Sequence, residues 1–481
     1  MSPRRIRAAS LTRLLGAWRS DQSGPAYRQL ADGLRLLILD GRLPLDVVLP
    51  GERELAAALE VSRTTVTGAF ARLREQGFLQ SRQGAGARTR LPTGPGQRDA
   101  GPLIRPSEPG VIDLIVAAMP AGEFVHQAYA KAIEALPAHL PHHGYEPVGL
   151  PVLREAIADR YTRRGLPTAP DQVLVTHGAQ HAWALMLRLL TGPGDRVVID
   201  HPTYPNAIDA ILRASCRPVP VSLPPGEGWD VEGVVAAFQQ SAPRLAHLVP
   251  DFHNPTGRWM DFAAREAIAA AGARTRTVVV FDETMLDLAL DGLRASYGFA
   301  EPPGSVVRLG STGKSFWGGL RIGWIRAEPD MIAALGRMRA SIDLGTPVLE
   351  QLAAAALLQD DEAALAARRA DLRARRDLLV MLAAERLTDW RVSPPPGGLS
   401  VWAELPAPVS NALAATCERH GVRIAAGPRF GVDGAFERFV RLPFTLPSEP
   451  MSEAIDRLAA AYGRLRPQAA HPAEPVARAV V

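Results

Sequence analysis

Apolar residues recur every three or four positions near the start of this 481-residue chain, which is the spacing of one helical face. The first such set is Leu30, Leu34, Leu37 and Ile38. It predicts a helix over residues 26–40, and Gly41 would end that helix. The same period continues in two further segments, residues 52–59 and residues 63–76.

The last two of these helices are separated only by residues 60–62, and so short a turn matches the helix-turn-helix signature. Ser62 is a suitable N-cap for the second helix, and Gly77 follows it. Beyond Gly77, two short strands are expected at 78–82 and 87–90, around the glycine-rich residues 83–86. This pattern predicts a basic hairpin, or wing, after the helix-turn-helix.

The N-terminal turn of the second helix in such a motif reaches base edges in the DNA major groove. Arginine there can contact guanine, and threonine can contact phosphate or a thymine methyl group. Basic residues of the preceding helix and of the wing would neutralise phosphates. The candidate DNA contacts are therefore Arg53, Ser62, Arg63, Thr64, Thr65, Thr67, Arg82, Gly84 and Gly86.

The charge distribution supports a polyanion-binding module at the start of the chain. Residues 1–100 contain 16 Arg, no Lys and nine acidic residues, which gives a net charge of +7. The whole chain carries +4, so the remainder carries about −3. A helix-turn-helix used only for protein contacts is the alternative, but the basic residues cluster on the elements that would face a duplex. We therefore expect double-stranded operator DNA as a partner.

Composition and periodicity change farther along the chain. Residues 91–110 are rich in proline and glycine, which is typical of a linker. Short apolar runs then alternate with helical segments, which favours an α/β domain with a mostly parallel sheet. Strands are expected at 173–176, 196–200, 245–249, 277–281 and 306–309. The predicted organisation is an N-terminal arm (1–23), a winged helix-turn-helix (24–90), the linker (91–110), the α/β domain (111–465) and a disordered tail (466–481).

The chain has 54 basic residues, of which only Lys131 and Lys314 are lysines. So strong an arginine bias leaves lysine mainly where a guanidinium cannot serve, as in the condensation of a primary amine with an aldehyde. Lys131 falls in an expected exposed helix and is interpreted as a surface residue. Lys314 lies just after the strand 306–309, near the sheet edge where ligands of α/β domains bind.

Pyridoxal 5′-phosphate needs a set of groups that this edge of the sheet offers. Lys314 would supply the amine, Asp282 an anion beside the pyridine nitrogen, and Asn254 a donor to the ring hydroxyl. Tyr204 is the candidate for stacking on the ring. Each residue alone also fits a structural role as a cap, a turn or a core residue. Their common placement at strand ends favours the cofactor.

The phosphate of the cofactor needs backbone amides and a cation. A helix is expected after His177, and its N-terminal amides would bind an anion. The candidate phosphate ligands are Gly178, Ala179, Gln180, Ser311 and Arg321. The segment GSTGKS (310–315) superficially suggests a nucleotide-binding P-loop, but that loop needs a glycine five positions before Gly313, where Arg308 stands.

Two stretches carry resemblances to known families. Residues 24–90 resemble the GntR-type winged helices through LPGERELAAALEVSRTTVTGAFARLREQGFL (49–79). Residues 111–465 resemble the fold-type-I aminotransferases through HHGYEPVGLPVLREAI (142–157), HPTYPN (201–206), HNPTG (253–257), FDE (281–283), STGKSFWGGLRIGW (311–324) and FVRLPFT (439–445). The combination resembles the MocR subfamily of transcription regulators. It implies a head-to-tail homodimer on DNA that senses an amine, an amino acid or the cofactor itself.

The aminotransferase resemblance also implies roles for single residues. Lys314, Asp282, Asn254, Ser311 and Arg321 would hold the cofactor. Arg441 would bind a substrate or effector carboxylate through both guanidinium nitrogens, and Tyr145 would approach the cofactor of the neighbouring subunit.

One departure stands out at the cofactor site. A tyrosine is usual two or three residues after the aspartate, and Thr284 and Met285 stand there instead. Thr284 offers a weaker donor to the ring hydroxyl and Met285 offers none, so efficient transamination is not expected.

Two alternatives stay open. The chain can be an active pyridoxal-phosphate-dependent aminotransferase with an appended DNA-binding domain, or a regulator whose sensor has lost the cofactor. The retention of Lys314 argues against the second alternative.

We expect a cytoplasmic protein without membrane contact. No apolar run is long enough to cross a bilayer, and the basic N-terminus lacks the apolar stretch of a signal peptide. Cys216 and Cys417 are too few for a disulfide framework and lack metal-ligand spacing, so no metal site is expected.

Overall fold

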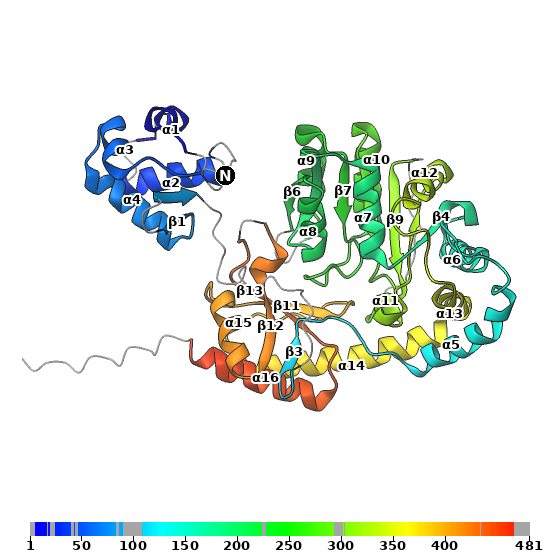
Figure 1. The fold of residues 1–481 in the computed structure, drawn as a ribbon. Helices are drawn as coiled ribbons and strands as arrows, with labels where there is room; N and C mark the ends of the chain where they lie inside the picture. Colours follow the sequence, from blue (N-terminus) through cyan, green and yellow to red (C-terminus); the bar gives the residue numbers. More distant parts are fainter. Residues whose placement is uncertain are drawn as a thin grey trace, which may run out of the picture. The chain divides into compact units, whose positions relative to one another are not determined.

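The computed structural model of the chain describes residues 5–16, 18–19, 25–39, 43, 47–82, 86–89, 108–223, 228–292, 302, 304–432 and 434–465. The predictions for Gly41, for Gly84, for most of the linker and for the tail lie outside these residues. The chain divides into two compact units, Met1–Leu103 and Ile104–Val481 (Figure 1).

The first unit is a small helical body followed by a hairpin. Its elements are α1 (Ala8–Leu15), α2 (Ala26–Leu39), α3 (Glu52–Ala58), α4 (Arg63–Glu75), β1 (Leu79–Arg82) and β2 (Gly86–Thr89). The apolar positions that predict the helices form one core, in which Leu30, Leu34, Leu55 and Val66 are fully buried. The predicted trihelical arrangement and the wing are therefore present.

Helix α1 was not expected from the pattern, which predicts only an arm over residues 1–23. Leu11 of α1 is fully buried in the same core as α2, α3 and α4, and Leu14 and Leu15 pack against it. The helix ends where Gly16 adopts a positive φ of 57°. A helix of eight residues has too few turns for its apolar spacing to distinguish it from a basic arm. Only the packing of its side chains shows that it is a helix.

The N-terminus of α4 and the wing follow the predicted turn chemistry. The Ser62 hydroxyl accepts a hydrogen bond from the Thr65 amide at 3.1 Å, which confirms the predicted N-cap of α4. Strands β1 and β2 pair antiparallel. Residues 47–49 extend the hairpin, because the Leu49 amide donates to the Ala87 carbonyl at 2.8 Å.

The second unit is built on a seven-stranded sheet. In spatial order its strands are β4 (Val173–Thr176), β10 (Gly323–Arg326), β9 (Val306–Ser311), β8 (Val278–Asp282), β7 (Leu245–Leu248), β5 (Arg196–His201) and β6 (Arg217–Ser222). Strand β10 runs antiparallel to both neighbours, and every other pair is parallel. The predicted α/β class with a mostly parallel sheet is confirmed.

Helices cover both faces of this sheet, which is why its strands are apolar at successive positions. On one face, residues such as Ile199 and Val280 pack against α7 (Ala179–Leu190), α8 (Pro205–Arg213) and α12 (Pro329–Arg339). On the other face, residues such as Val198 and Val279 pack against α9 (Val231–Ser241) and α10 (Phe262–Thr275). Neighbouring residues of one strand therefore serve opposite cores.

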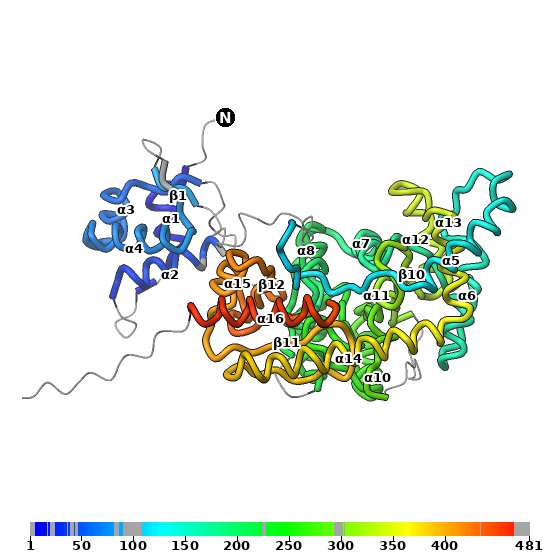
Figure 2. Tube along the Cα trace, turned by 90° about the horizontal axis from the view of Figure 1, so that it is seen from below, coloured from blue at the N-terminus to red at the C-terminus, as the bar shows by residue number. Residues whose placement is uncertain are grey.

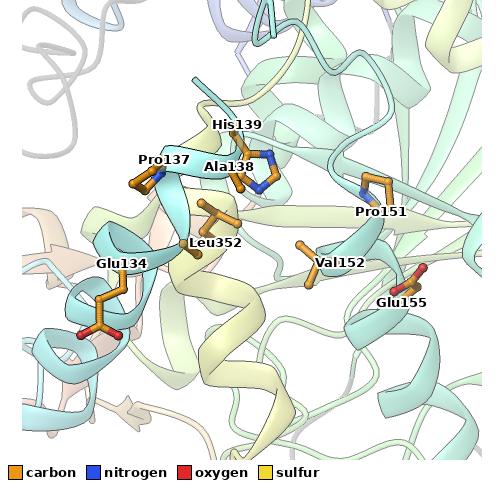
Figure 3. A pocket seen from close by; sticks show the side chains of 9 residues that line it. Glu134, Pro137, Ala138, His139, Pro151, Val152, Glu155 and Leu352 are labelled. Carbon is orange, nitrogen blue, oxygen red and sulfur yellow. The ribbon is translucent and has the colours of Figure 1, made fainter. Parts of the chain in front are cut away.

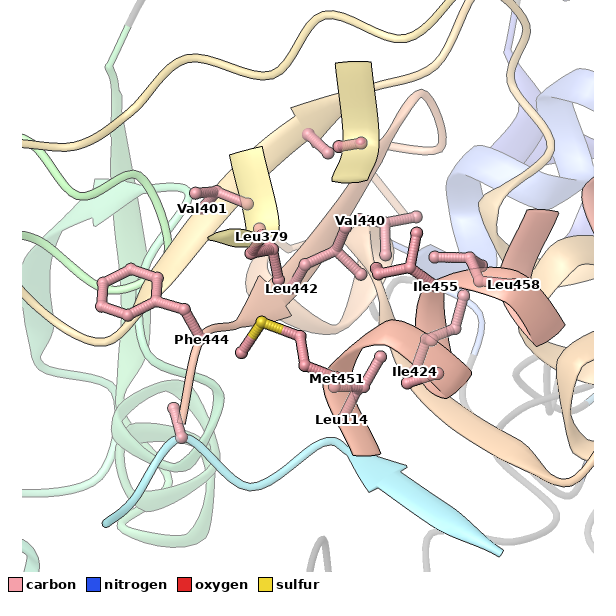
Figure 4. Packing of buried hydrophobic residues seen from close by; sticks show 14 of the residues in the cluster. Leu114, Leu379, Val401, Ile424, Val440, Leu442, Phe444, Met451, Ile455 and Leu458 are labelled. Atoms are coloured by element: carbon pink, nitrogen blue, oxygen red, sulfur yellow. The ribbon is translucent and has the colours of Figure 1, made fainter. Parts of the chain in front are cut away.

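A second, four-stranded sheet was not expected from the pattern. Its order is β11 (Ser400–Glu404), β13 (Phe439–Pro443), β12 (Val422–Ala426) and β3 (Ile112–Leu114). The side chains of this sheet meet those of α14 (Glu362–Arg386) and α16 (Ser448–Gly463), as Figure 4 shows for Leu379, Leu442 and Met451. Helix α15 (Ser410–Arg419) packs against β12.

The remaining helices form a third cluster, in which α5 (Glu123–Ala135) and α6 (Pro151–Arg163) pack on α13 (Val348–Gln359). Helix α14 links this cluster to the small sheet, because Leu365 near its start belongs to the first and Leu379 to the second (Figure 2). Lys131 lies exposed on α5, as expected. Among the described residues, no helix combines the length and the apolarity needed to span a membrane.

Candidate cofactor site and DNA-binding surface

The predicted cofactor residues meet at one edge of the large sheet. Asp282 is the last residue of β8 and Ser311 the last of β9, while Gly178 follows β4 and Asn254 follows β7. These strands are parallel or aligned as parallel, so their carboxyl ends share this edge. The sequence rule that placed the site at strand ends therefore leads to one compact site.

Asp282 is buried, and its carboxylate is held on both sides. The Thr284 amide donates to Oδ1 at 3.1 Å, and Nε2 of His247 faces Oδ2 at 3.6 Å. Burial alone would raise the pKa of Asp282, but His247 and Thr284 outweigh it and lower the pKa. Asp282 is therefore an anion, as the partner of a protonated pyridine nitrogen must be.

Lys314 lies on the single helical turn α11 (Thr312–Ser315), directly after β9. Its Nζ donates to the Ala117 carbonyl at 2.7 Å. Burial, with a further contribution from the positive charge of Arg441, lowers the pKa of Lys314 to about 8. A larger share of this amine is unprotonated near neutral pH than for a surface lysine, so it is a better nucleophile.

The turn after β4 has the geometry expected of the predicted phosphate cradle. Gly178 has a φ of 80° and precedes α7, whose first residues are Ala179 and Gln180. The backbone amides of a first helical turn lack partners inside the helix and point towards an anion. Arg321 Nη2 donates to the His177 carbonyl at 2.8 Å and would lie 3.1 Å from a Cβ on Gly178. Glycine therefore leaves room for a guanidinium beside the helix terminus.

Ser311 acts first as a structural residue. Its hydroxyl caps α11 by accepting from the Gly313 amide at 3.0 Å, and it donates to the Ile322 carbonyl at 3.1 Å. The Gln180 side chain is likewise engaged, because Nε2 donates to the Asn206 carbonyl at 3.1 Å. Only the backbone amide of Gln180 then faces the cradle.

The same edge of the site also carries Tyr204, Asn254 and Arg441. The Tyr204 hydroxyl accepts from Asn206 Nδ2 at 2.7 Å, and burial raises the pKa of Tyr204. Asn254 Oδ1 accepts from Arg441 Nη1 at 3.2 Å, so the amide nitrogen of Asn254 is the group left to donate to a ligand. Arg441 itself is almost completely buried on β13 and lies 5.0 Å from the Phe430 ring.

Arg441 has the donors that a carboxylate ligand requires. Burial lowers its pKa to about 10, with a further contribution from Arg429. Its Nε is buried and has no hydrogen-bond partner among the residues that the structure describes. A buried donor left unmatched is unfavourable, so an anionic group that pairs with it would stabilise the site.

A short backbone segment crosses the site between these cations. We call residues 115–120, which follow β3, the strap. Arg441 Nη2 donates to the Ile115 carbonyl, Lys314 Nζ to the Ala117 carbonyl at 2.7 Å, and Arg368 Nη2 to the Pro120 carbonyl at 3.0 Å. The strap therefore holds the two cations of the site through its carbonyl groups.

The structure shows how Thr284 and Met285 are placed where a tyrosine is usual. Thr284 is half-buried and gives its backbone amide to Asp282, while Met285 is buried in the apolar cluster around the small sheet. Tyr145 lies apart from these residues in an exposed loop, with 61% of its surface accessible, and stacks on His143. Its approach to the cofactor of a neighbouring subunit stays a prediction.

Two histidines and an aspartate gather next to the phosphate cradle. Nε2 of His177 and Nε2 of His181 each lie 3.2 Å from Asp343 Oδ2. His181 Nδ1 accepts from the His177 amide at 3.1 Å, so the proton of a neutral His181 is assigned to Nε2. That proton faces Asp343, which also pairs with Arg339 at 2.6 Å. The cluster thus fixes the loop after α12 against the start of α7.

The predicted DNA contacts occupy the first unit. Arg53, Arg63 and Thr64 are exposed, and Thr65 is half-buried in the first turn of α4. Thr67 is also exposed, but its hydroxyl donates to Glu52 Oε2 at 2.8 Å, and Glu52 lies within 3.9 Å of Arg63 Nε. Gly86 begins β2 with a φ of 78°, and Arg82 ends β1.

Sequence reasoning missed two features of the site. The strap acts through carbonyl oxygens, which every residue has, so no residue pattern marks it. His247 carries a signal, because a histidine interrupts an otherwise apolar strand at 245–249. A single buried histidine is more often a core residue than a functional one, and only its contact with Asp282 distinguishes it.

A winged helix-turn-helix joined to an α/β domain that places a half-buried lysine, a buried aspartate and a glycine-opened helix terminus at one sheet edge defines a class: DNA-binding proteins with an aminotransferase-like domain. The chain belongs to the family of class I and II aminotransferases, whose model matches residues 111–458. The model of the bacterial regulatory proteins of the gntR family matches residues 26–88. This combination is that of the MocR-type GntR regulators.

Individual relatives include both regulators and an enzyme. The HTH-type transcriptional regulator YisV of Bacillus subtilis is 25% identical over 480 residues, 90% of this chain and 95% of that protein. The Probable rhizopine catabolism regulatory protein MocR of Rhizobium meliloti is 29% identical over 401 residues, 77% of this chain and 79% of that protein. The crystal structure of LysN, the α-aminoadipate aminotransferase of Thermus thermophilus, matches with a TM-score of 0.66 and 27% identity, over 77% of this chain and 97% of that chain.

The class I and II aminotransferases use pyridoxal 5′-phosphate, and LysN was crystallised with N-(5′-phosphopyridoxyl)-L-leucine. The residues of this chain fit that cofactor. A half-buried amine with a lowered pKa, a buried carboxylate kept as an anion, and a glycine-opened helix terminus beside an arginine stand at one sheet edge. These are the aldehyde, pyridine and phosphate partners that the cofactor requires.

Proposed function

We propose that this protein is a transcription regulator whose sensor unit binds pyridoxal 5′-phosphate through Lys314 and a carboxylate-bearing effector through Arg441. The observation that carries the proposal is the placement of Lys314. One of only two lysines in the chain is half-buried, has a pKa lowered to about 8 and lies at the same sheet edge as Asp282. An amino acid is the effector class that meets both the amine-binding cofactor and the arginine.

The cofactor supplies an aldehyde that captures amines and a ring that withdraws electrons. The chain's own residues do the rest. Lys314 supplies the amine, Asp282 would hold a negative charge beside the ring nitrogen, and Asn254 offers an amide donor. Ala179, Gln180 and Arg321 bind the phosphate through backbone amides and a guanidinium. Roles for Ser311 and Thr284 are more structural, as caps of α11 and of the Asp282 carboxylate.

Within this proposal the strap is the route from the sensor site to the DNA-binding unit. It follows β3, and β3 begins at Ile112, directly after the predicted linker at 91–110. A ligand that takes Arg441 or Lys314 competes with the Ile115 or Ala117 carbonyl. The effector can shift DNA binding only to the extent that it binds the two strap positions unequally.

The proposal includes a homodimer in which Tyr145 approaches the partner's cofactor. Large apolar side chains are exposed around this residue on the sensor unit, namely Leu140 at 69%, Leu344 at 45% and Ile342 at 42%. An open groove is lined by Pro137 of η1 (Leu136–Ala138), Val152 of α6 and Leu352 of α13 (Figure 3). Exposed apolar surface of this kind is typical of subunit contacts. Dimer formation is tested by sedimentation of the full chain and of Leu140→Asp, which should shift towards monomer.

An active aminotransferase is the second candidate, because Arg441 and Asn254 lie where a catalytic site would need them. Thr284 and Met285 count against it, since neither provides the phenol that usually faces the ring hydroxyl. Incubation of the loaded protein with amino acids and 2-oxoglutarate decides the matter. Repeated turnover would support an enzyme, and a single conversion of bound cofactor would support a sensor.

The cofactor claim is tested by absorption spectroscopy of the full chain with added pyridoxal phosphate. Wild type should give a visible band that borohydride removes, and mass spectrometry should find the reduced adduct on Lys314. Lys131→Ala is the matched control, because it removes the only other lysine and should change nothing. Lys314→Ala should lose the band. A band that persists in Lys314→Ala would refute the assignment.

The DNA claim is tested with double-stranded fragments that the full chain itself enriches from a genomic library. Arg63→Ala should weaken binding by about tenfold or more, as loss of a base contact does. Arg391→Ala, which removes an exposed arginine of the sensor unit, is the control. Equal binding by Arg63→Ala and wild type would remove α4 as the recognition helix.

A further inference from the structure

His247 occupies an unexpected place for a polar side chain. It lies in β7 with 1% of its surface exposed, and its ring centroid is 4.5 Å from that of Trp183 on α7. Its neighbours Leu245 and Leu248 on the same strand are fully buried. An apolar aromatic residue would fill this position without the desolvation cost that an imidazole brings. The polar atoms of His247 therefore need a reason to be there.

The two ring nitrogens have different surroundings. Nε2 faces Asp282 Oδ2 at 3.6 Å, whereas Nδ1 is buried and has no hydrogen-bond partner among the described residues. A neutral imidazole carries one proton, and the carboxylate favours it on Nε2. The N–H group of His247 is therefore directed at the Asp282 carboxylate.

We propose that His247 is a positioning residue that fixes Asp282 as an anion where the cofactor's ring nitrogen would bind, and so sets the preference of the site for a protonated pyridine nitrogen. The inference rests on the proposed cofactor site. Thr284 holds one carboxylate oxygen of Asp282 through its amide, and His247 faces the other. The carboxylate is thus fixed between β7 and the turn after β8, with a defined direction towards the ligand.

The alternative is that His247 serves only the packing of β7 against α7. The two roles differ in what they predict for ligands. Loss of packing weakens every ring that enters the site. Loss of the charged partner weakens only rings with a nitrogen to protonate. A cofactor analogue with carbon in place of the ring nitrogen separates the two roles.

The experiment compares binding of pyridoxal phosphate and 1-deaza-pyridoxal phosphate to the full chain by absorbance titration. Wild type should bind the nitrogen-bearing ring more tightly. His247→Phe, which fills the same space, should reduce that preference by about tenfold or more, because the Asp282 carboxylate loses its polar partner at 3.6 Å. His247→Gln should keep the preference within about threefold, because its amide nitrogen can reach the place of Nε2.

A double variant tests whether His247 and Asp282 act through the same carboxylate. Asp282→Asn should remove most of the preference, and His247→Phe should then add nothing further, because both act through one carboxylate. An unchanged preference in His247→Phe, or equal losses for the two ligands, would overturn the proposal and leave a packing role. Wild type that binds neither ligand would instead refute the proposed cofactor site itself.

Discussion

The turn that carries Lys314 depends on a buried ion network, and removal of Asp287 tests its contribution. The Asp287 carboxylate accepts from Arg160 at 2.6 Å, from Arg164 at 2.7 Å and from the Ser315 hydroxyl at 2.6 Å. The Arg160 and Arg164 side chains are 4% and 14% exposed and that of Asp287 is 7% exposed. Both guanidiniums hold the pKa of Asp287 far below its ordinary value, in spite of burial.

The expected cost of Asp287→Ala follows from what remains. Breaking a buried pair by removing one partner costs about 3–5 kcal/mol, because the other charge stays buried. Asp361 still accepts from Arg160 at 2.9 Å and lies 3.6 Å from Arg164, so part of the charge stays compensated. We therefore expect the lower end, a loss of about 3 kcal/mol in the free energy of unfolding.

The assay is urea unfolding of the full chain followed by tryptophan fluorescence. Seven of the eight tryptophans lie in the second unit, so the signal reports its unfolding. With a denaturant slope of about 3 kcal/mol per molar, the midpoint should fall by about 1 M. Asp371→Ala is the matched control, because Asp371 pairs with Arg375 on the surface of α14 and is 46% exposed. Such a pair contributes about 1 kcal/mol at most.

A shift in Asp287→Ala no larger than in the control would refute the reasoning. A second measurement links the network to the site. Ser315 loses its acceptor next to Lys314, so the affinity for pyridoxal phosphate should fall by about tenfold. Stability that falls while cofactor affinity stays unchanged would mean that the network holds α6 but not the Lys314 turn.

Three further predictions concern other parts of the chain. Because the pKa of Lys314 is lowered to about 8, capture of pyridoxal phosphate should accelerate as pH rises through about 8 in stopped-flow absorbance, and a midpoint near the ordinary 10.5 would contradict this. Gly310→Ala would place a Cβ inside the contact distance of the Trp324 ring and should lower stability by about 1–3 kcal/mol or more in urea unfolding, whereas Gly463→Ala, in open space, should not. Ser62→Ala should cost about 1 kcal/mol at the start of α4, measured by hydrogen exchange of the full chain, and unchanged exchange at Thr65 would contradict the cap.

The sequence predicts the parts of this protein in which local pattern and chemistry coincide. The helix-turn-helix follows from apolar spacing and the Ser62 cap, and the large sheet follows from apolar runs bounded by turns. The cofactor edge follows because parallel strands end together, so Asp282 and Lys314 can be placed without a structure. In each case the signal lies within a few residues of its consequence.

The parts that the sequence does not predict depend on distant segments. Strand β3 has only three residues, and it pairs with β12 about 300 residues farther along the chain. No local period marks so short a strand. Helix α1 is revealed only by the burial of Leu11 against other helices. The strap acts through carbonyl oxygens, and His247 acts through a contact across two strands, so neither is visible in residue type alone.

The contacts of the strap bear on which combination of ligands can release it. Its two central contacts lie two residues apart, at Ile115 and Ala117, and they hold different cations, Arg441 and Lys314. A ligand that engages only one cation leaves the segment tethered by the other. Within the proposed function, freeing residues 115–117 requires both contacts to be exchanged, while Arg368 still holds Pro120. The proposed sensor is then expected to respond to the cofactor and a carboxylate together and to neither one alone.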